Sequence, residues 1–510
     1  MTKHASLDSG KVYLVGAGPG HPGLLTVRGM QLLRRADLIL YDKLAPHSLL
    51  EYAKPGAEMR SVVELAAHHP ERVAPIHEMM IEAAQRGLCV VRLKGGDPSI
   101  FGRGGEEAQA LREAGVPFEI VPGVTAALGA AAFAGIPLTH RAYCSAVAFV
   151  TGHENPAKPD TALDWAALAK FPGTLVLYMG MSRLDRLVAH LIEQGKDPKT
   201  PAAVVRMATT GDQQTVDSTL AELPNAVRLA GLAAPALVIV GDVVQLRKEV
   251  AWFENLPLFN KRVLVTRPQT QSAELAAQIV ERGGRPYLLP AVEIREPDDW
   301  SPVDQAIADL RDYQWLVFTS VHGVDYFLQR LRNLGRDLRA LGHIKLAAIG
   351  PKTADALRRH GLDPDVVPER YQSEDLAAAL HGAITPGDRI LLARADRGRE
   401  LLRESLSATN EVTQVAVYSQ VDAANVDPEL IDHLRRGEID FITLTSSNIA
   451  RSLVKQLDET CLERIRQGQI KLVTLSSVTS DAVRELGLPI GAEAEEATME
   501  GILRALEKLV

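Results

Sequence analysis

Cysteine is scarce in this sequence, which also has neither a long apolar run nor an excess of basic residues. Its three cysteines, Cys89, Cys144 and Cys461, lie far apart in 510 residues, which excludes a disulfide scaffold and a clustered cysteine metal site. The apolar stretches have the length of strands, so we expect no transmembrane helix. Few cysteines and a polar amino-terminal segment are typical of a cytoplasmic protein.

The charge of the chain limits its partners. A formal net charge of -8 argues against nucleic acid, whose binding proteins usually carry a basic excess. Any anionic ligand must therefore be met by local arginine and lysine residues. The hydrophobic share of 46% and the charged share of 24% are ordinary for a globular protein, and the length suits about three or four compact units.

Short β-branched runs alternate with glycine-rich turns and segments of helical period through the first half. This alternation predicts an α/β fold with buried strands. The predicted strands are residues 12–15, 38–41, 89–93, 118–121, 147–151, 174–179, 202–207 and 236–240.

A domain boundary is expected where this alternation breaks, at residues 247–261. The segment mixes charges and has no sustained period, and a new strand, RVLVTR, follows it at once. Its aromatic residues Trp252, Phe253 and Phe259 suggest that the linker packs on a surface.

The second half contains an internal repeat. WLVFTS at 315–320 matches FITLTS at 441–446, and Thr353 matches Thr479, always 126 positions apart. Upstream, RVLVTR and RILLAR pair at an offset of 127. The repeat predicts two similar α/β lobes across a cleft, a common kind of ligand site. Two independent copies without a shared site are the alternative.

Four glycine-rich or turn-forming loops interrupt the first half. The loop GAGPGH after residue 15 lacks the last glycine of the dinucleotide fingerprint, because His21 stands there, and its proline Pro19 removes an amide donor. The other loops are residues 94–107, 121–126 and 137–141. We expect all four at the carboxyl ends of strands, where open α/β sheets bind ligands. Any one of them alone would be read as a plain tight turn.

Four segments of the first half, VGAGPGHPGLLTVRGMQLLRRADLILYDKL, GGDPSIFGRGGEE, VPGVTAALGAAAFAGIPLTHR and LVLYMGM, carry a specific resemblance. They resemble the uroporphyrinogen-III C-methyltransferases, and GGDPSIFGRGGEE discriminates best. The resemblance implies a two-lobed tetrapyrrole methylase fold over residues 11–247 that binds S-adenosylmethionine between its lobes. It also implies a homodimer and a tetrapyrrole substrate that is methylated twice to precorrin-2.

Residue roles follow from this resemblance by position. Asp42 lies where the family has its proposed general base, with pairing to Lys43 or helix capping as the alternative. Arg103 and Arg141 are our candidates for the substrate carboxylates, because an arginine fork suits a carboxylate; solvated surface charges are the alternative. The implied cofactor contacts are Pro19, Gly95, Gly96, Asp97, Ile100, Thr125, Ala126, Met179 and Ala208.

Two positions depart from the family. Glu64 stands where the family has a lysine proposed as proton donor, and His21 stands where an aspartate is typical. His68 or His69 could replace that lysine, or the step needs no dedicated acid. This departure leaves methylation of a later corrin precursor as an alternative.

The second half carries KRVLVTRP, VFTSVHGVDYF, AAIGPKTADALRRHGL, ILLARADRGRELL, VAVYSQV, FITLTSSNIARSL and VTLSSVTSDAVRELGL in this order. With the repeat, these segments resemble uroporphyrinogen-III synthase over residues 261–510. The resemblance implies two flavodoxin-like lobes, residues 261–292 with 421–510 and residues 293–419, joined by a hinge near 290–294 and 417–420. Residues 248–260 would then be a linker and residues 1–10 a disordered tail.

The second half has no Ser-His-Asp, Cys-His or metal-spaced cluster, so we expect no metal, and the implied reaction explains why. Hydroxymethylbilane loses its hydroxyl readily, and the enzyme must mainly fold it so that ring D closes inverted. Ser320, Thr353, Ser446 and Thr479 are candidates for gripping its acidic side chains, and Tyr418 for assisting water loss. The alternatives are helix N-caps, a tyrosine packed between lobes, and a tetrapyrrole-binding module without turnover.

Overall fold

The structure is a computed structural model that describes residues 10–63, 74–152, 163–398, 400–423 and 427–510. Contacts divide the chain into two compact units, Met1–Lys261 with Ile279–Arg285 and Arg262–Gln278 with Pro286–Val510. The predicted disordered tail before Gly10, and the positions Glu64, His68 and His69, lie outside the described residues.

The first unit begins with a sheet of five parallel strands in the order β3-β2-β4-β1-β5. Both faces are buried, as a parallel sheet between helices requires. Tyr13 and Val15 pack on one face, Val12 and Leu14 on the other. The strands are β1 (Lys11–Gly16), β2 (Leu38–Tyr41), β3 (Glu58–Ser61), β4 (Cys89–Lys94) and β5 (Phe118–Val121).

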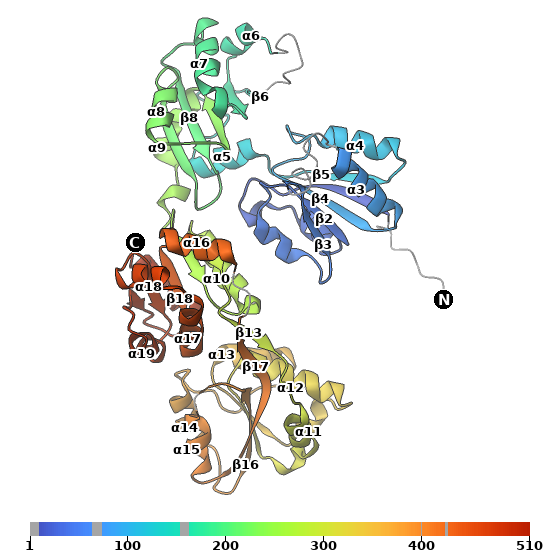
Figure 1. Ribbon diagram of the computed structural model, residues 1–510, viewed down its shortest axis with the longest axis vertical. Helices are drawn as coiled ribbons and strands as arrows, with labels where there is room; N and C mark the ends of the chain where they lie inside the picture. Colours follow the sequence, from blue (N-terminus) through green and yellow to red (C-terminus); the bar gives the residue numbers. More distant parts are fainter. Residues whose placement is uncertain (1–9, 64–73, 153–162, 399, 424–426) are drawn as a thin grey trace. The chain divides into compact units, whose positions relative to one another are not determined.

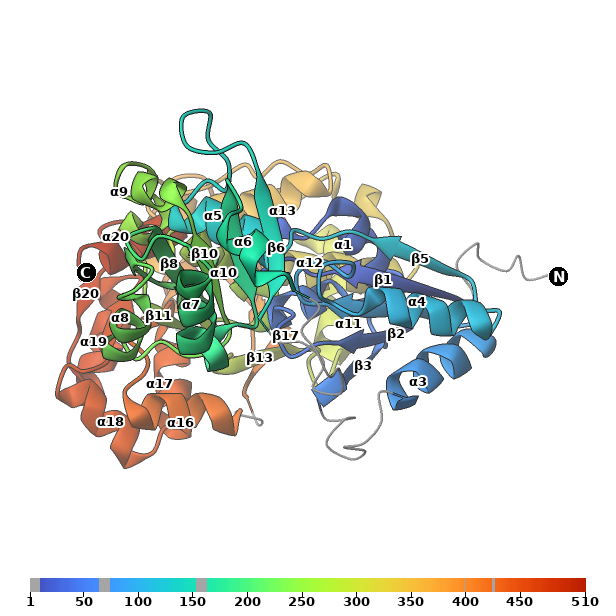
Figure 2. The ribbon, with the colours of Figure 1, turned by 90° about the horizontal axis from the view of Figure 1, so that it is seen from above.

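Helices cover both faces of this first sheet. On one face lie α1 (Val27–Leu33) and the 3-10 helix η2 (His47–Tyr52). On the other face α3 (Ala74–Gln85) and α4 (Gly104–Glu113) lie side by side (Figure 2). The result is the three-layered α/β arrangement that the strand pattern predicts.

The second sheet of the first unit is mixed, in the order β6-β7-β10-β8-β9. Only β6 and β7 run parallel; β10 is antiparallel to both of its neighbours, and β9 is antiparallel to β8. Neither β9 nor β3 is among the strands named from the sequence, because QTVDST and EMRS lack an apolar run. The strands are β6 (Val147–Thr151), β7 (Thr174–Tyr178), β8 (Pro201–Arg206), β9 (Gln214–Thr219) and β10 (Ala236–Val240).

The helix α5 (Ala126–Ala134) follows the first sheet in the chain and lies beside the second sheet (Figure 1). Its alanines Ala127, Ala130 and Ala134 share a core cluster with that sheet. The remaining helices of this lobe are α6 (Trp165–Ala169), α7 (Leu184–Glu193), α8 (Leu223–Leu229) and α9 (Arg247–Val250).

The segment after α9 packs on α5, as its aromatic residues predict. Trp252 Nε1 donates a hydrogen bond of 2.9 Å to the carbonyl oxygen of Ala132. Phe253, which is 2% exposed, places its ring 4.8 Å from that of Phe133. The predicted linker is therefore held on the first unit.

The second unit contains two sheets of five strands. One has the order β12-β11-β18-β19-β20 and the other the order β13-β17-β16-β14-β15. The first is built from β11 (Arg262–Val265), β12 (Arg285–Leu288), β18 (Phe441–Leu444), β19 (Lys471–Thr474) and β20 (Ala492–Glu493). The second is built from β13 (Val292–Arg295), β14 (Trp315–Phe318), β15 (Lys345–Ala348), β16 (Arg389–Ala395) and β17 (Glu411–Asp422).

Helices flank both of these sheets, and none in the described part of the chain combines the length and apolar character that crossing a membrane requires. The helices near the first of the two sheets are α10 (Gln269–Glu281), α16 (Pro428–Arg436), α17 (Ser447–Gln456), α18 (Glu459–Arg466), α19 (Ser477–Glu485) and α20 (Met499–Glu507). Those near the second are α11 (Ser301–Ala308), α12 (Val321–Asn333), α13 (Pro351–Arg359), α14 (Ser373–His381) and α15 (Leu401–Ser407).

The structure confirms the internal repeat. β14 and β15 pair in parallel with Trp315 opposite Lys345, and β18 and β19 pair in the same register with Phe441 opposite Lys471. After β14 and β18, the repeated Thr-Ser ends in a helix N-cap, since Ser320 caps α12 and Ser446 caps α17. Both serines therefore act as N-caps, and their contact with a ligand stays a prediction.

The cap of α17 can be tested by hydrogen exchange. Ser446 Oγ accepts a hydrogen bond of 3.3 Å from the amide of Ile449. We expect Ser446→Ala to cost about 1 kcal/mol locally and to speed exchange of the Ile449 amide about fivefold. Ser446→Asp, which keeps an acceptor, should exchange much like the wild type; equal acceleration in both variants would contradict the capping role.

Candidate functional site

Neighbouring strands β4 and β1 bring two of the glycine-rich loops into direct backbone contact. The amide of Gly96 donates to the carbonyl oxygen of Gly18 at 2.8 Å, and the amide of Gly18 donates back at 3.2 Å. The amide of Ala17 donates to the carbonyl oxygen of Lys94 at 2.7 Å. These hydrogen bonds extend the pairing of β1 and β4 beyond the carboxyl edge of the sheet.

A third loop, after β5, approaches the same place so closely that side chains are excluded. A Cβ atom on Gly16 would lie 2.6 Å from Gly123 Cα and 2.7 Å from the carbonyl oxygen of Gly96. A Cβ atom on Gly123 would overlap that same carbonyl oxygen. Gly96 also has a φ of 67°, a conformation that L side chains rarely adopt. Glycine at these positions is thus set by close backbone packing.

Asp97 fastens the second loop to the third. Its carboxylate is 9% exposed and accepts hydrogen bonds from the amides of Ser99 at 2.7 Å and Gly123 at 2.9 Å. Both carboxylate oxygens are therefore engaged with backbone, and the side chain holds the shape of the loops.

Thr125 and Tyr178 connect the two lobes of the first unit. Their hydroxyl oxygens are 2.7 Å apart, and Tyr178 Oη also accepts from the amide of Ala127 at 3.0 Å. Burial raises the pKa of the Tyr178 phenol, so it stays protonated and can donate to Thr125. Met179, the next residue, is thereby held beside the start of α5.

The loop after β8 meets the first glycine loop. The amide of His21 donates to Thr209 Oγ1 at 3.0 Å, and a Cβ atom on Gly20 would lie 3.3 Å from the carbonyl oxygen of Ala208. Ala208 thus joins Pro19 and the strand-end loops of the first sheet.

Backbone strain is concentrated in these loops. Six described non-glycine residues have positive φ, and five of them lie in the loops that join the strands and helices of the two lobes; the sixth, Asn260, lies in the segment after α9. Such conformations persist only where the surroundings enforce them, and they cluster at functional sites. Two of the five, Phe101 and Met179, also expose apolar side chains, by 41% and 50%. The five residues are Phe101, Arg103, Met179, Met207 and Thr209.

One of the four predicted loops is placed differently. Residues 137–141 follow the helix α5 and not a strand, because the apolar alanine-rich segment before them is helical. Arg103 and Arg141 are exposed, so the structure leaves both the surface-charge and the ligand interpretation of these arginines standing.

Asp42 is paired with a buried arginine. Its carboxylate accepts from Arg92 Nη2 at 2.5 Å, and the side chains are 30% and 4% exposed respectively. Arg92 Nε also donates to Glu107 Oε1 at 3.0 Å, and that oxygen accepts from Lys94 Nζ at 2.9 Å. The partner of Asp42 is thus Arg92, and not Lys43.

The four charges form a buried network of two acids and two bases beneath the strand-end loops. Burial lowers the pKa of Lys94, with Arg92 acting in the same direction and Glu107 opposing it. Glu107 Oε2 is buried and has no hydrogen-bond partner among the described residues. The network fixes the orientation of Asp42, which keeps part of its carboxylate open to solvent.

In the second unit, Tyr418 on β17 is 4% exposed and donates to Ser320 Oγ at 3.0 Å. Burial raises its pKa, so the phenol remains protonated. The His322 ring lies 5.7 Å from the Tyr418 ring, and Tyr326 stacks on it at 6.0 Å. Tyr418 and Ser320 are therefore brought together, as a shared site requires.

Thr353 and Thr479 occupy equivalent places in the repeat, each third in its helix and 4% and 2% exposed. Thr479 Oγ1 lies 3.3 Å from Ser476 Oγ. Their burial favours a role in the start of α13 and α19 at least as much as contact with a ligand.

Sequence reasoning missed several residues of both sites. The sequence did not predict the roles of Arg92, Lys94 and Glu107. A charged residue in a buried strand or helix belongs to no recognisable motif. Tyr178 was predicted only as part of the strand at residues 174–179. Around Tyr418, the structure adds His322, which the sequence analysis contained only as a residue of the segment VFTSVHGVDYF.

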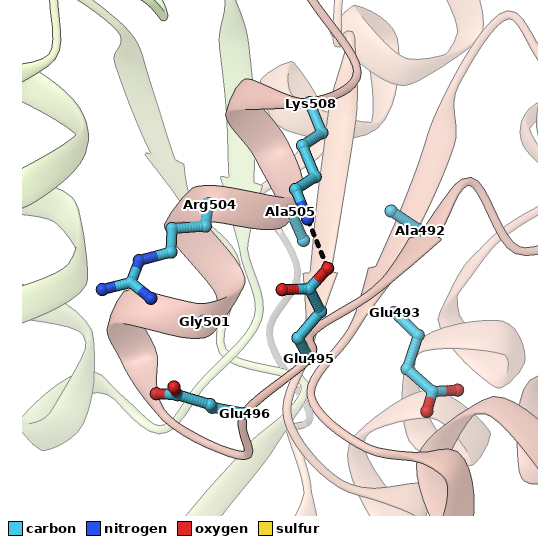
Figure 3. A pocket seen from close by; sticks show the side chains of 8 residues that line it. All are labelled: Ala492, Glu493, Glu495, Glu496, Gly501, Arg504, Ala505 and Lys508. Atoms are coloured by element: carbon cyan, nitrogen blue, oxygen red, sulfur yellow. Dashed lines mark hydrogen bonds and ion pairs between the residues drawn. The ribbon is translucent and has the colours of Figure 1, made fainter.

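A small pocket lies elsewhere, between α20 and the loop around β20 (Figure 3). Glu495 and Lys508 form an ion pair of 2.5 Å there. None of the predicted site residues lines this pocket, so it has no part in either site.

Two protein families match the chain in succession. "Tetrapyrrole (Corrin/Porphyrin) Methylases" match residues 11–224, and "Uroporphyrinogen-III synthase HemD" matches residues 273–504. The chain is similar to "Porphyrin biosynthesis protein HemD" of Ruminiclostridium josui, with 31% identity over 98% of both chains. It is 37% identical to "Uroporphyrinogen-III C-methyltransferase" of Bacillus subtilis over 72% of this chain and 78% of that protein. A crystal structure of uroporphyrin-III-C-methyltransferase from Thermus thermophilus is 42% identical and covers 47% of this chain and 98% of its own, with a TM-score of 0.39.

Fold and families together define a two-part α/β enzyme of tetrapyrrole biosynthesis. The chain belongs to the family in which a uroporphyrinogen-III C-methyltransferase of the tetrapyrrole methylase type is fused to a uroporphyrinogen-III synthase. The cofactor of its methyltransferase half is S-adenosylmethionine.

The buried network around Asp42 yields a stability prediction. Glu107→Gln removes the negative charge that Arg92 and Lys94 share, so we expect it to cost about 3–5 kcal/mol. Glu106→Gln changes the exposed neighbour on the same helix and should cost less than about 0.5 kcal/mol. Hydrogen exchange of the β4 amides measures both; equal protection in the two variants would show that the network does not stabilise the sheet.

The loop packing yields a second prediction. Gly123→Ala forces a methyl group onto the Gly96 carbonyl, and we expect a cost of about 1–3 kcal/mol or more. At Gly105, a Cβ atom meets nothing within 4 Å, so Gly105→Ala should be neutral or slightly stabilising. Urea unfolding of the first unit measures the free energy of unfolding of both variants. Equal values for Gly123→Ala and Gly105→Ala would show that the loops can separate without cost.

Proposed function

We propose that the chain catalyses two consecutive steps on one tetrapyrrole. The second unit cyclises hydroxymethylbilane to uroporphyrinogen III with inversion of ring D, and the first unit methylates that product at C2 and C7 to give precorrin-2. One observation supports the proposal above all. The predicted cofactor residues lie in or next to loops that contain residues with positive φ and that are hydrogen-bonded to one another.

The loops of the first unit suit S-adenosylmethionine. Backbone at Gly95 and Gly96 lies at the carboxyl edge of the sheet, where open α/β sheets take ligands, and Ile100 and Met179 offer apolar side chains. The proposed contacts are Pro19, Gly95, Gly96, Asp97, Ile100, Thr125, Ala126, Met179 and Ala208. When bound, the cofactor supplies a strongly electrophilic methyl group, so positioning provides much of the rate.

Of these residues, Asp97 acts chiefly by holding the loops, since both of its oxygens bind backbone amides. Asp42 is the proposed general base for the proton that leaves the methylated ring, because its carboxylate is oriented by Arg92 and remains partly open. Arg103 and Arg141 are the proposed partners of the substrate carboxylates.

In the second unit, Tyr418 is the proposed acid that gives a proton to the departing hydroxyl, which leaves as water. Its burial and its hydrogen bond to Ser320 keep the phenol protonated and fixed. Ser320, Thr353, Ser446 and Thr479 are the proposed hydroxyl contacts to the acidic side chains. The macrocycle then closes through a spiro intermediate. The bond from ring D to its original bridge carbon breaks, that carbon bonds to the other α-carbon of ring D, and this α-carbon loses its proton, while the cleft supplies shape.

We further propose residues 11–247 as the methyltransferase, 248–260 as the linker and 261–510 as the synthase, with synthase lobes at 261–292 plus 421–510 and at 293–419. The two matched families support this division. We propose a homodimer formed through the methyltransferase, and mass measurement in solution tests it.

The product of hydroxymethylbilane tests the proposal directly. Without S-adenosylmethionine, we expect uroporphyrinogen III; with it, a dimethylated product. Chromatography and mass spectrometry of the oxidised products identify both. Only the spontaneous type I isomer would contradict the synthase assignment and favour a binding module, and an unmethylated product in the presence of the cofactor would contradict the methyltransferase assignment.

Asp97→Ala separates the two activities. Losing the carboxylate frees the amides of Ser99 and Gly123, so we expect methylation of supplied uroporphyrinogen III to fall at least about a hundredfold, consistent with a misplaced site. Cyclisation of hydroxymethylbilane should stay at the wild-type rate. Parallel loss of both activities would refute separate sites.

A further inference from the structure

Arg267, which follows β11, is a partly buried cation that forms no ion pair with any described carboxylate. Its Nη2 donates to Gln271 Oε1 at 2.5 Å and its Nη1 to the thioether sulfur of Met499 at 2.8 Å. Its Nε is buried without a hydrogen-bond partner, and no carboxylate among the described residues forms an ion pair with it. Burial lowers the pKa of Arg267, as expected for a cation removed from water.

This arrangement is costly for the fold alone. A buried charge is normally paired, and a thioether is only a weak acceptor. The carboxylate of Glu274, which acts on Arg267 at longer range, is held 2.7 Å from Lys352 Nζ. A neutral side chain would therefore serve the stability of the unit better than this arginine.

The repeat offers an internal comparison. Arg394 stands at the equivalent place after 127 positions, near the end of β16, and is 6% exposed. Its guanidinium lies 3.7 Å from Glu400 Oε1. The same position of the repeat thus carries a carboxylate neighbour in one lobe and none in the other.

Arg267 is linked to the residues around Tyr418. Gln271 Nε2 lies 2.8 Å from His322 Nε2, which connects α10 of one lobe to α12 of the other. The His322 ring lies beside Tyr418. Burial lowers the pKa of His322, with Arg267 acting in the same direction and Asp325 opposing it. Arg267, Gln271 and His322 thus form a hydrogen-bonded row that ends beside the proposed synthase acid.

We propose that Arg267 binds a carboxylate side chain of the linear tetrapyrrole, assisted by Gln271 and His322, and so holds one end of the substrate beside Tyr418. The inference rests on the proposed synthase activity. The guanidinium of Arg267 now donates to a neutral amide oxygen and to a thioether sulfur. A carboxylate would bind it more strongly, because hydrogen bonds between charged groups are about twice as strong as those between neutral groups. An acetate or propionate side chain supplies that group, and no bond is made or broken at Arg267.

The test compares Arg267→Gln, Arg267→Lys and a control, Arg451→Gln, in the full chain. Arg451 is exposed and pairs with Glu485 on the neighbouring helix. We expect Arg267→Gln to raise the KM for hydroxymethylbilane about tenfold or more, the loss of one charged hydrogen bond, with a much smaller change in kcat. Arg267→Lys should lie between, and Arg451→Gln should match the wild type.

A second readout separates binding from folding. Because the substitution removes a partly buried charge that has no carboxylate partner among the described residues, the unfolding temperature of Arg267→Gln should equal or exceed that of the wild type. An unchanged KM in Arg267→Gln overturns the inference. A lowered unfolding temperature in both Arg267 variants also overturns it, by assigning the arginine a structural role.

Binding of uroporphyrin III, followed by its fluorescence, distinguishes this inference from the proposed function. If the wild type binds this probe but forms no type III product, the synthase assignment fails while the role of Arg267 is still measured. Weaker binding by Arg267→Gln than by Arg451→Gln then supports the inference, and equal binding overturns it.

Discussion

The methyltransferase half depends on the close approach of three loops at one edge of a parallel sheet. Gly16, Gly96 and Gly123 lie so near one another that a methyl group on the first or the last would strike backbone. Asp97 holds the second loop to the third by two amide hydrogen bonds. Because Thr125 and Met179 are positioned from this edge through Tyr178, a disturbance of the loop contact would reach both lobes.

Charge is handled differently in the two units. In the first, Arg92 and Lys94 are buried, but Glu107 and Asp42 compensate them, so that the network stabilises and orients the proposed base. In the second, Arg267 has no carboxylate partner among the described residues, which we expect to lower the stability of this unit. A chain of net charge -8 whose proposed substrates are polyanions needs such local cations, since its overall field repels anions.

The fold was largely predictable because strand-length apolar runs and a constant repeat offset are local signals. The strand β9 escaped prediction because its residues alternate without an apolar run, and residues 137–141 were misplaced because the helix before them is apolar throughout. The proposed cofactor loops were predicted partly through their glycines, and the structure shows that Gly16 and Gly123 are required by close backbone packing. The sequence did not predict the charged residues around Asp42 or the row from Arg267 to His322. Asp42 and Arg92, for example, are 50 positions apart. Burial and pairing over such distances leave no pattern in the sequence.

The central claim is that the fastened loops of the first unit form the cofactor site. Hydrogen exchange of the full chain with and without S-adenosylhomocysteine, the demethylated cofactor, tests it most directly. The account predicts saturable binding that protects amides at residues 16–21, 95–101 and 122–127 and leaves the second unit unchanged. No saturable binding, or protection confined to other segments, would contradict it.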